Sequence, residues 1–305
     1  MEENVYTIGK GKFLFRQSGQ MNFRDLGNCP DFKLAEKLEK KPHYSSREGT
    51  KQKDKDPTIA QEATSSITLD SLLDENIKLW IMSNAITDVV QAQGTISAQA
   101  VTAELDMWID LGKKKLSSIA VKAETPSAWQ ATHAYLAGVF AVPTESNGYR
   151  YECTTAGTSD DTEPASWPTT SGETVTDGTV VWTCRKLTYT LNTDYRLDIE
   201  VGHLMPLSTG DIEDGQTLNL DFSHAAITLK RMDAAKTATI EGDIYFVGNP
   251  PFGKIIDVKG YVSLTPKGDL SLIGEDYMNM QFDMEFLSGH GYNGLFEVYN
   301  RGIVQ

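Results

Sequence analysis

The sequence has few cysteines, few basic residues and no long apolar run. Its 305 residues include only three cysteines, and a chain of this length can bury a core without disulfides. The 28 basic residues stand against 42 acidic ones, a formal net charge of -14, which argues against a protein that wraps nucleic acid by neutralising phosphates. No apolar run approaches the roughly 20 residues of a membrane-spanning helix. The first ten residues also lack a signal peptide's basic start and apolar centre, so we expect synthesis in the cytoplasm and no membrane span.

Catalytic motifs are also missing. The five histidines show no metal-ligand spacing, and the sequence contains no CxxC, HExxH, GxSxG or phosphate-binding loop. We therefore expect no enzyme, no metal and no cofactor. Two acid pairs, Asp198 with Glu200 and Asp283 with Glu285, are each spaced to share one strand face, as a glycosidase dyad could. A solvated polar face is the favoured interpretation, and a glycosidase is an alternative.

Alternating apolar and polar residues dominate the rest of the chain. This pattern is found in residues 12–16, 237–246, 253–264 and 278–286. It also covers the segment with Tyr195, Leu197, Ile199 and Val201. Turns with Gly and Pro separate these segments. The pattern predicts a mainly antiparallel β-sandwich or β-barrel. One helix is predicted where apolar residues recur at helical spacing over 69–81, with Asp70 or Ser71 as its N-cap.

Residues 40–63 are polar and show little apolar periodicity. We expect a long loop there, either functional or disordered in the isolated protein. The overlapping segment 33–56 is basic, although the whole chain is acidic.

Residues 125–184 interrupt the β pattern with a stretch rich in Thr, Ser, Gly, Pro and Trp, in which Arg150 is the only basic residue. The flanking segments 113–123 and 188–202 both alternate like half-buried strands. We therefore expect a discontinuous β domain of residues 1–124 and 185–305, with 125–184 as a small inserted β module that projects from its surface.

The inserted segment holds most of the aromatic residues that could bind a ligand. Exposed rings could stack on sugars, whereas buried rings would form the core of a module of this size, and the core is the favoured role. The possible glycan contacts are Trp129, Tyr149, Tyr151, Trp167 and Trp182. Cys153 and Cys184 lie on two candidate strands and could face each other, either as reduced thiols, which a cytosolic origin favours, or as a disulfide.

Residues 151–184 carry Tyr-x-Cys, Trp-Pro, Asp-Gly and Trp-x-Cys landmarks. They resemble a short module of tailed-phage structural proteins that looks like a carbohydrate-binding domain. Sugar binding by the insert is implied by that resemblance.

The surrounding segments 23–57, 65–84 and 193–223 contain a Leu-Gly-Asn turn, a His-Tyr-Ser-Ser-x-x-Gly stretch and a helix with Glu75-Asn76. In this order they are similar to the major tail tube proteins of long-tailed (siphovirus-type) bacteriophages. The resemblance implies a tail-tube-type β fold with one helix, in hexameric rings that stack into a tube for genome DNA. It places the protein in the virion tail, assembled in the host cytoplasm.

That resemblance gives the polar segments expected roles. An acidic lumen would let DNA slide without binding, and its candidate residues are Asp198, Glu200, Asn279, Gln281, Asp283 and Glu285. The long loop would contact the neighbouring ring through Arg47, Lys51, Lys53 and Lys55. The expected partners are further copies of the chain, other tail proteins, passing DNA and surface glycans. The alternatives are a glycan-binding surface β protein, or another phage structural protein such as a tail terminator or capsid decoration protein.

Overall fold

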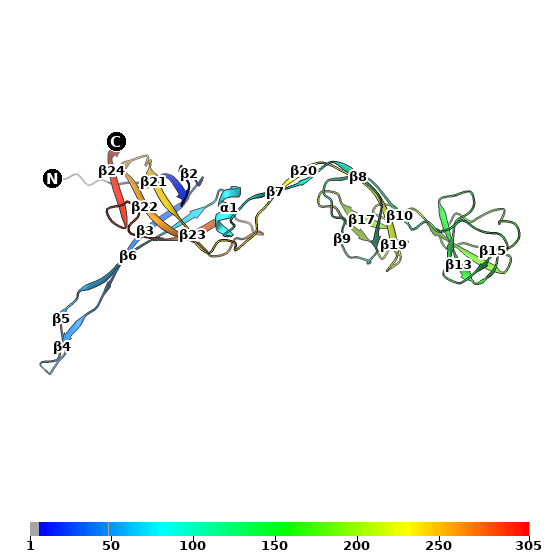
Figure 1. The fold of residues 1–305 in the computed structure, drawn as a ribbon, viewed down its shortest axis with the longest axis horizontal. Coiled ribbons are helices and arrows are strands. Elements are labelled where there is room, and N and C mark those ends of the chain that lie inside the picture. Colours follow the sequence, from blue (N-terminus) through cyan, green and yellow to red (C-terminus); the bar gives the residue numbers. More distant parts are fainter. Residues whose placement is uncertain (1–5, 48, 305) are drawn as a thin grey trace. The chain divides into compact units, whose positions relative to one another are not determined.

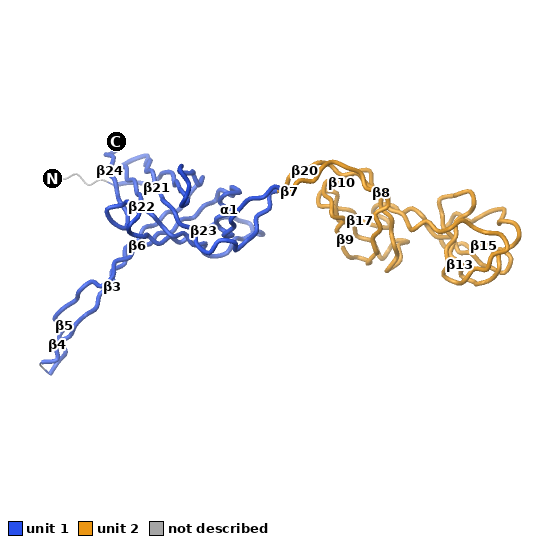
Figure 2. The backbone as a smooth tube through the Cα atoms, viewed as in Figure 1, with its two compact units in different colours: residues 1–88, 230–305 blue, residues 89–229 orange. Residues whose placement is uncertain are grey.

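The computed structural model describes residues 6–47 and 49–304. The chain divides into two compact units, shown in different colours in Figure 2: unit 1 comprises residues 1–88 and 230–305, and unit 2 comprises 89–229. The boundaries fall within β7 (Thr87–Gln91) and β20 (Ile227–Arg231), which pair with each other. Each unit has a core of its own.

Unit 1 is built on one eight-stranded sheet (Figure 1). In pairing order its strands are β2 (Arg24–Asp25), β1 (Gly11–Gln17), β21 (Ile240–Gly248), β22 (Gly253–Lys267), β23 (Met280–Phe286), β6 (Thr58–Leu69) and β3 (Asp31–Lys40), with β24 (Phe296–Val304) paired to β22. The long strand β22 pairs with β24 through its first half and with β23 through its second half. All these pairings are antiparallel.

The core of unit 1 lies on one face of this sheet. On β23, Met280, Phe282, Met284 and Phe286 are buried, whereas the residues between them are not. This is the predicted alternation of a strand with one face in a core. Side chains of β1, β6, β21 and β22 that share this face belong to the same cluster, with Leu26 and with Leu79 of α1 (Asp74–Trp80).

The helix α1 begins later than the sequence pattern indicates, and the predicted N-cap is wrong. Its N-cap is Leu73, which makes no side-chain capping bond. Asp70 and Ser71 instead hold Asn28: the Asn28 side chain donates to Asp70 Oδ2 at 2.7 Å, and its backbone N–H donates to Ser71 Oγ at 2.9 Å. Both side chains therefore bind the segment around Asn28 and do not cap the helix.

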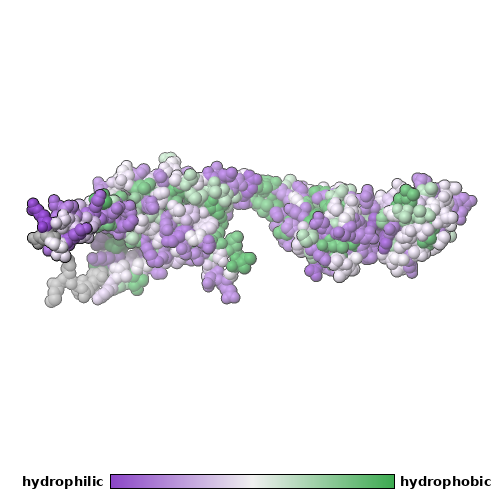
Figure 3. Space-filling view, turned by 90° about the horizontal axis from the view of Figure 1, so that it is seen from below, coloured by the Kyte–Doolittle hydropathy of each residue, from purple (hydrophilic) through white to green (hydrophobic). Residues whose placement is uncertain are grey.

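Paired strands lie within residues 40–63, where a loop was expected. β3 pairs with β6 from Asp31 opposite Thr68 to Lys40 opposite Thr58, and β4 (His43–Ser45) pairs with β5 (Gln52–Lys55) near the tip. We call residues 31–69 the hairpin arm. The described residues of its outer part, 36–47 and 49–62, are nearly all exposed, so the alternation that marks a strand is absent. Figure 3 shows mainly hydrophilic residues over this arm.

Unit 2 contains a body and a small third sheet. The body has two three-stranded sheets: β10 (Leu116–Ala123), β19 (Thr217–His224) and β8 (Gly94–Thr102), and β17 (Tyr195–Asp198), β18 (His203–Pro206) and β9 (Ile109–Asp110). Buried residues of both sheets form its core. The strand expected over 195–201 ends at Asp198, because Asp198 Oδ1 accepts the backbone N–H groups of Glu200 and Val201 and closes a turn.

The segment 125–184 forms the small sheet with a separate core. Its strands are β12 (Phe140–Ala141), β13 (Tyr149–Thr155), β16 (Val180–Lys186) and β15 (Thr174–Asp177), beside a two-stranded pair of β11 (Ala134–Tyr135) and β14 (Gly157–Thr158). The buried side chains of this third cluster all come from residues 135–184. The expected limits at 125 and 184 therefore lie inside unit 2, at the edges of this core.

The prediction of a mainly β, antiparallel fold with one helix is confirmed over the described residues.

Candidate functional site

The outer face of the unit 1 sheet brings together polar residues from five strands. Residues directly opposite each other in neighbouring strands point to the same face. Asp283 of β23 lies opposite Thr265 of β22 and Ser66 of β6, and Ser66 lies opposite Lys33 of β3. The neighbouring rows add Gln281 with Lys267, Thr68 and Asp31, and Glu285 with Ser263, Thr64, Ala35 and Glu241. We call these three rows the polar face.

The polar face carries more negative than positive charge. Its two lysines each pair with a carboxylate: Lys267 Nζ lies 3.0 Å from Asp283 Oδ1, and Lys33 Nζ lies 2.6 Å from Asp31 Oδ2. In the part of the chain that the structure describes, neither Glu285 nor Glu241 has a cation partner. A shallow hollow of about 420 Å³ lies on this face, between the lysines and the carboxylates of β23.

Four charged residues of the polar face escaped the sequence analysis: Asp31, Lys33, Glu241 and Lys267. Each lies on a different strand from the acidic pair of β23, and only the strand register shows that they share its face. No local sequence signal links them.

The six lumen candidates do not lie on one strand face. Gln281, Asp283 and Glu285 share the polar face, and Asn279 precedes β23 as an exposed residue. Asp198 and Glu200 belong to unit 2, where Asp198 ends β17 and Glu200 lies in the following turn. The expectation that these two share a strand face is therefore wrong, because the Asp198 carboxylate closes the turn that ends the strand.

The four cations expected to contact another ring lie near the tip of the hairpin arm. Lys51, Lys53 and Lys55 lie on or beside β5, and Arg47 follows β4. Lys53 Nζ forms an ion pair with Asp56 Oδ2 at 2.5 Å. Within residues 6–47 and 49–304, no ion pair is found for Arg47, Lys51 or Lys55, so the exposed tip presents positive charge.

The aromatic residues of the small sheet mostly form its core. Tyr151 and Trp182 are fully buried, so the glycan contacts proposed for them are not possible in this conformation. Trp129, Tyr149 and Trp167 are half-buried and pack against the same cluster. The indole N–H of Trp129 donates to Asp177, and that of Trp167 donates to Glu163.

Cys153 and Cys184 are free buried thiols. They lie diagonally across the β13–β16 pair, because Cys153 is opposite Trp182 and Cys184 is opposite Tyr151. Diagonal neighbours are about 7–8 Å apart, beyond the usual reach of a disulfide. Burial raises the pKa of both thiols, which keeps them protonated and unreactive.

The described residues contain no cluster of three or more His, Cys, Asp or Glu side chains that could hold a metal ion. Among the same residues, no helix is long and apolar enough to cross a membrane.

Comparison with protein families gives a match over part of the chain. A family model described as "Protein of unknown function UCP028589" matches residues 6–153. The matched segment runs from the start of unit 1 through the hairpin arm and α1, and ends on β13 of the small sheet. No curated protein matches the chain. The chain is thus similar to this family over nearly half of its length, including the junction at residue 125.

Proposed function

We propose that this protein is a structural subunit of a phage tail tube, which assembles into stacked rings around a passage for genome DNA. The proposal rests on the sequence resemblance together with the surfaces of unit 1. Its role is mechanical and electrostatic, and it needs no catalytic residue.

The hairpin arm is the observation that carries the proposal. Beyond the sheet, its two strands have no other strand partner in the described chain, and most of their side chains are exposed. Its exposed residues include the apolar side chains Leu38, Tyr44 and Ile59. An isolated two-stranded hairpin is at best marginally stable in water. An arm of this kind gains stability when it lies against another subunit, as a contact between rings requires.

The edges of the unit 1 sheet also suit a ring. β3 and β24 each pair with one neighbouring strand only, so each leaves one side of its backbone without a strand partner within the described chain. Exposed edges invite pairing with another chain, and closure of strands into a ring removes them. β24 additionally exposes Val298, Tyr299 and Ile303.

The polar face is our proposed lumen surface. Its uncompensated carboxylates, Glu241 and Glu285, repel DNA phosphates and so oppose the counterion release that drives DNA binding to basic proteins. This assignment uses the expected residues Gln281, Asp283 and Glu285, and leaves Asp198 and Glu200 outside it.

Negative-stain electron microscopy of the purified protein, over a range of concentrations, tests the proposal. Stacked rings or tubes are the expected result. Single rings that never stack would favour a terminator-like protein, and a monomer at every concentration would contradict a tube subunit. Sedimentation velocity on the same samples gives the number of subunits in the ring.

A further inference from the structure

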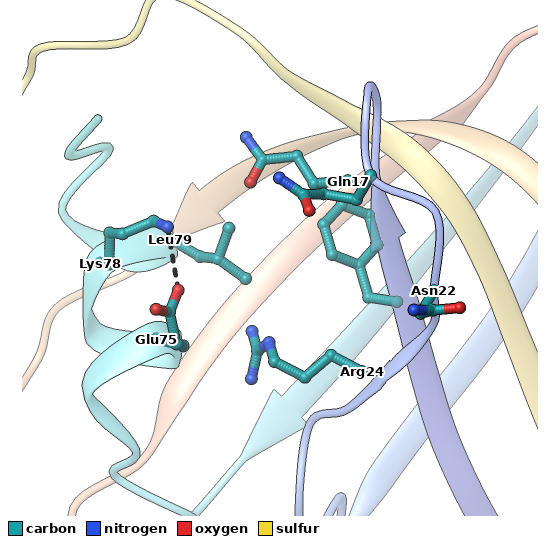
Figure 4. A pocket seen from close by; sticks show the side chains of 8 residues that line it. Gln17, Asn22, Arg24, Glu75, Lys78 and Leu79 are labelled. Atoms are coloured by element: carbon teal, nitrogen blue, oxygen red, sulfur yellow. Dashed lines mark hydrogen bonds and ion pairs between the residues drawn. The ribbon is translucent and has the colours of Figure 1, made fainter. Parts of the chain in front are cut away.

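Unit 1 has a second hollow, on the side of the sheet where α1 lies (Figure 4). Its volume is about 300 Å³, the lower limit for ligand pockets. The lining is mostly polar and comes from β1, the segment between β1 and β2, β2 itself, and α1. Its residues are Gln17, Gln20, Asn22, Arg24, Glu75 and Lys78, with Phe15 and Leu79.

A buried asparagine fixes the arginine of this hollow. Arg24 donates from a terminal guanidinium nitrogen to Asn76 Oδ1 at 2.7 Å. Asn76 is fully buried, and its amide donates to the backbone carbonyls of Leu26 at 2.7 Å and Ser71 at 3.0 Å. The Arg24 side chain is therefore held by a rigid support.

Within the described chain, no ion pair balances the charge on Arg24. Burial lowers its pKa, although Glu75 and Asp25 nearby act in the opposite direction. The nearest carboxylate of the lining, Glu75, pairs with Lys78 at 2.9 Å (Figure 4). Over the described residues, no carboxylate lies within ion-pair distance of Arg24. A guanidinium has five N–H donors in a fork that matches a carboxylate. The hydrogen bond to Asn76 uses one of them, so the others are available to a carboxylate.

The loop between β22 and β23, residues 268–279, has the complementary chemistry. Its side chains Leu272, Ile273 and Tyr277 are 75%, 95% and 94% exposed. Beside them lie Asp269, Glu275 and Asp276, for which the described chain provides no ion pair. Large apolar side chains at such exposure, next to unpaired acids, are typical of a surface that a partner covers.

We propose that Glu275 and Asp276 of one subunit enter the Arg24 hollow of a second copy, with the exposed apolar residues of the loop packing around the rim. The inference rests on the proposed assembly function and names its contact. The hollow and the loop are different surfaces of one chain, so the contact is head-to-tail. Head-to-tail contacts generate rings when the rotation closes.

Charge exchange between two variants tests the contact. The Arg24→Glu variant has an acidic hollow and an acidic loop, and the Glu275→Lys/Asp276→Lys variant has a basic hollow and a basic loop. Each alone should associate at least about tenfold more weakly than the wild type, as expected for loss of a charge-assisted pair. An equal mixture should regain association, because each loop then meets a hollow of opposite charge.

Two further measurements make the outcome decisive. The first uses the Glu275→Gln/Asp276→Gln variant, which changes only exposed side chains, so its loss of association cannot come from misfolding. The exposed-acid control is Asp161→Asn.

The second uses a fluorescent peptide of residues 268–279, with a scrambled peptide as control. The peptide should bind the wild-type protein and should not bind the Arg24→Gln variant. Unchanged association of the variants together with no peptide binding would overturn the contact. A wild type that stays monomeric yet binds the peptide through Arg24 would contradict the tube proposal while supporting recognition of the loop by the hollow.

Discussion

The indole of Trp182 donates a hydrogen bond to the carboxylate of Asp177 at 3.0 Å, with both side chains buried in the small sheet. The same oxygen of Asp177 accepts the indole N–H of Trp129 at 2.7 Å, and the other oxygen accepts the backbone N–H of Asp160 at 2.9 Å. One carboxylate therefore joins three parts of this sheet.

Replacing Asp177 with Asn should destabilise the small sheet by about 2 kcal/mol. An amide has one acceptor oxygen, so its NH2 group must face at least one of the three donors. Urea unfolding followed by tryptophan fluorescence measures the change, and Asp161→Asn, an exposed neighbour, is the control. An Asp177→Asn protein as stable as the control would show that these hydrogen bonds contribute little.

Acid should weaken unit 2 through Asp194. Burial by itself raises the pKa of this carboxyl, but the backbone N–H groups of Asp211 and Thr190 and the Lys186 ammonium outweigh it, and the pKa is lowered. A lowered pKa in the folded state contributes stability above the unfolded value of about 3.9, and that contribution is lost as the pH falls through the folded value.

The Asp194→Asn variant should therefore lose about 2 kcal/mol at pH 7. Its deficit relative to the wild type should begin to shrink as the pH falls below about 4, where the carboxyl of the unfolded wild type becomes protonated, and should vanish only below the lowered folded pKa. Urea unfolding of both proteins at several pH values measures this, with Glu173→Gln as an exposed control. A deficit that does not vary with pH would mean that the charge of Asp194 has no part in it.

The sequence predicts those strands that have one face in a core and one in water. β23 is such a strand, because the alternation from Met280 to Phe286 reflects burial on one side only. The hairpin arm could not be recognised in this way, because both of its faces are exposed. Its strands β3 and β6 are held by backbone pairing, which extends to Lys40 opposite Thr58. Local patterns also cannot show which distant group a polar side chain binds. Ser71, for example, accepts a hydrogen bond from the backbone N–H of Asn28.

The candidate site, like the fold, could be predicted from the sequence only in part. The exposed acids of β23 could be read from the sequence, but the strand register that adds Glu241 and Lys33 to their face could not. The support of Arg24 by Asn76 joins residues far apart in the chain through a single side-chain contact. No periodicity in the sequence records such a contact.

Deletion of residues 125–184, with a short Gly/Ser linker in their place, should leave the body of unit 2 folded. The backbone N–H of Ala123 donates to the carbonyl of Leu187 at 2.8 Å, so the two ends of the segment already lie side by side. The body's core uses no side chain from the deleted residues. Circular dichroism should show retained β structure and cooperative unfolding. An unfolded deletion protein would mean that the body depends on the small sheet.

Changing Asp283 and Glu285 to Lys should alter the free energy of unfolding by no more than about 1 kcal/mol. Both residues lie on the polar face, and within the described chain only Asp283 has an ion pair. If this face lines a tube, assembled variants should retain DNA at low salt and release it at high salt. Filter binding measures retention, with Asp160→Lys/Asp161→Lys giving the same charge change elsewhere. DNA release by the variant tubes as fast as by the wild type would remove the lumen assignment.

Replacing Arg47, Lys51, Lys53 and Lys55 with Ser should impair stacking of rings and leave the subunit folded. The four residues lie on the exposed tip of the hairpin arm. Among the residues that the structure describes, they form one ion pair, Lys53 with Asp56, which is local. Each substitution should therefore change stability by no more than about 0.5 kcal/mol. Electron microscopy should show single rings or short tubes where the wild type forms long ones.

A matched control removes the same charge from exposed lysines outside the arm: Lys10, Lys12, Lys236 and Lys254. Hydrogen exchange adds a second readout. In the free subunit the amides of the outer arm should exchange faster than those of β22 and β23, because most of the described residues of the outer arm are exposed. They should become protected on stacking. Equal stacking by both variants, or arm amides that are already well protected in the free subunit, would contradict a role for the arm in joining rings.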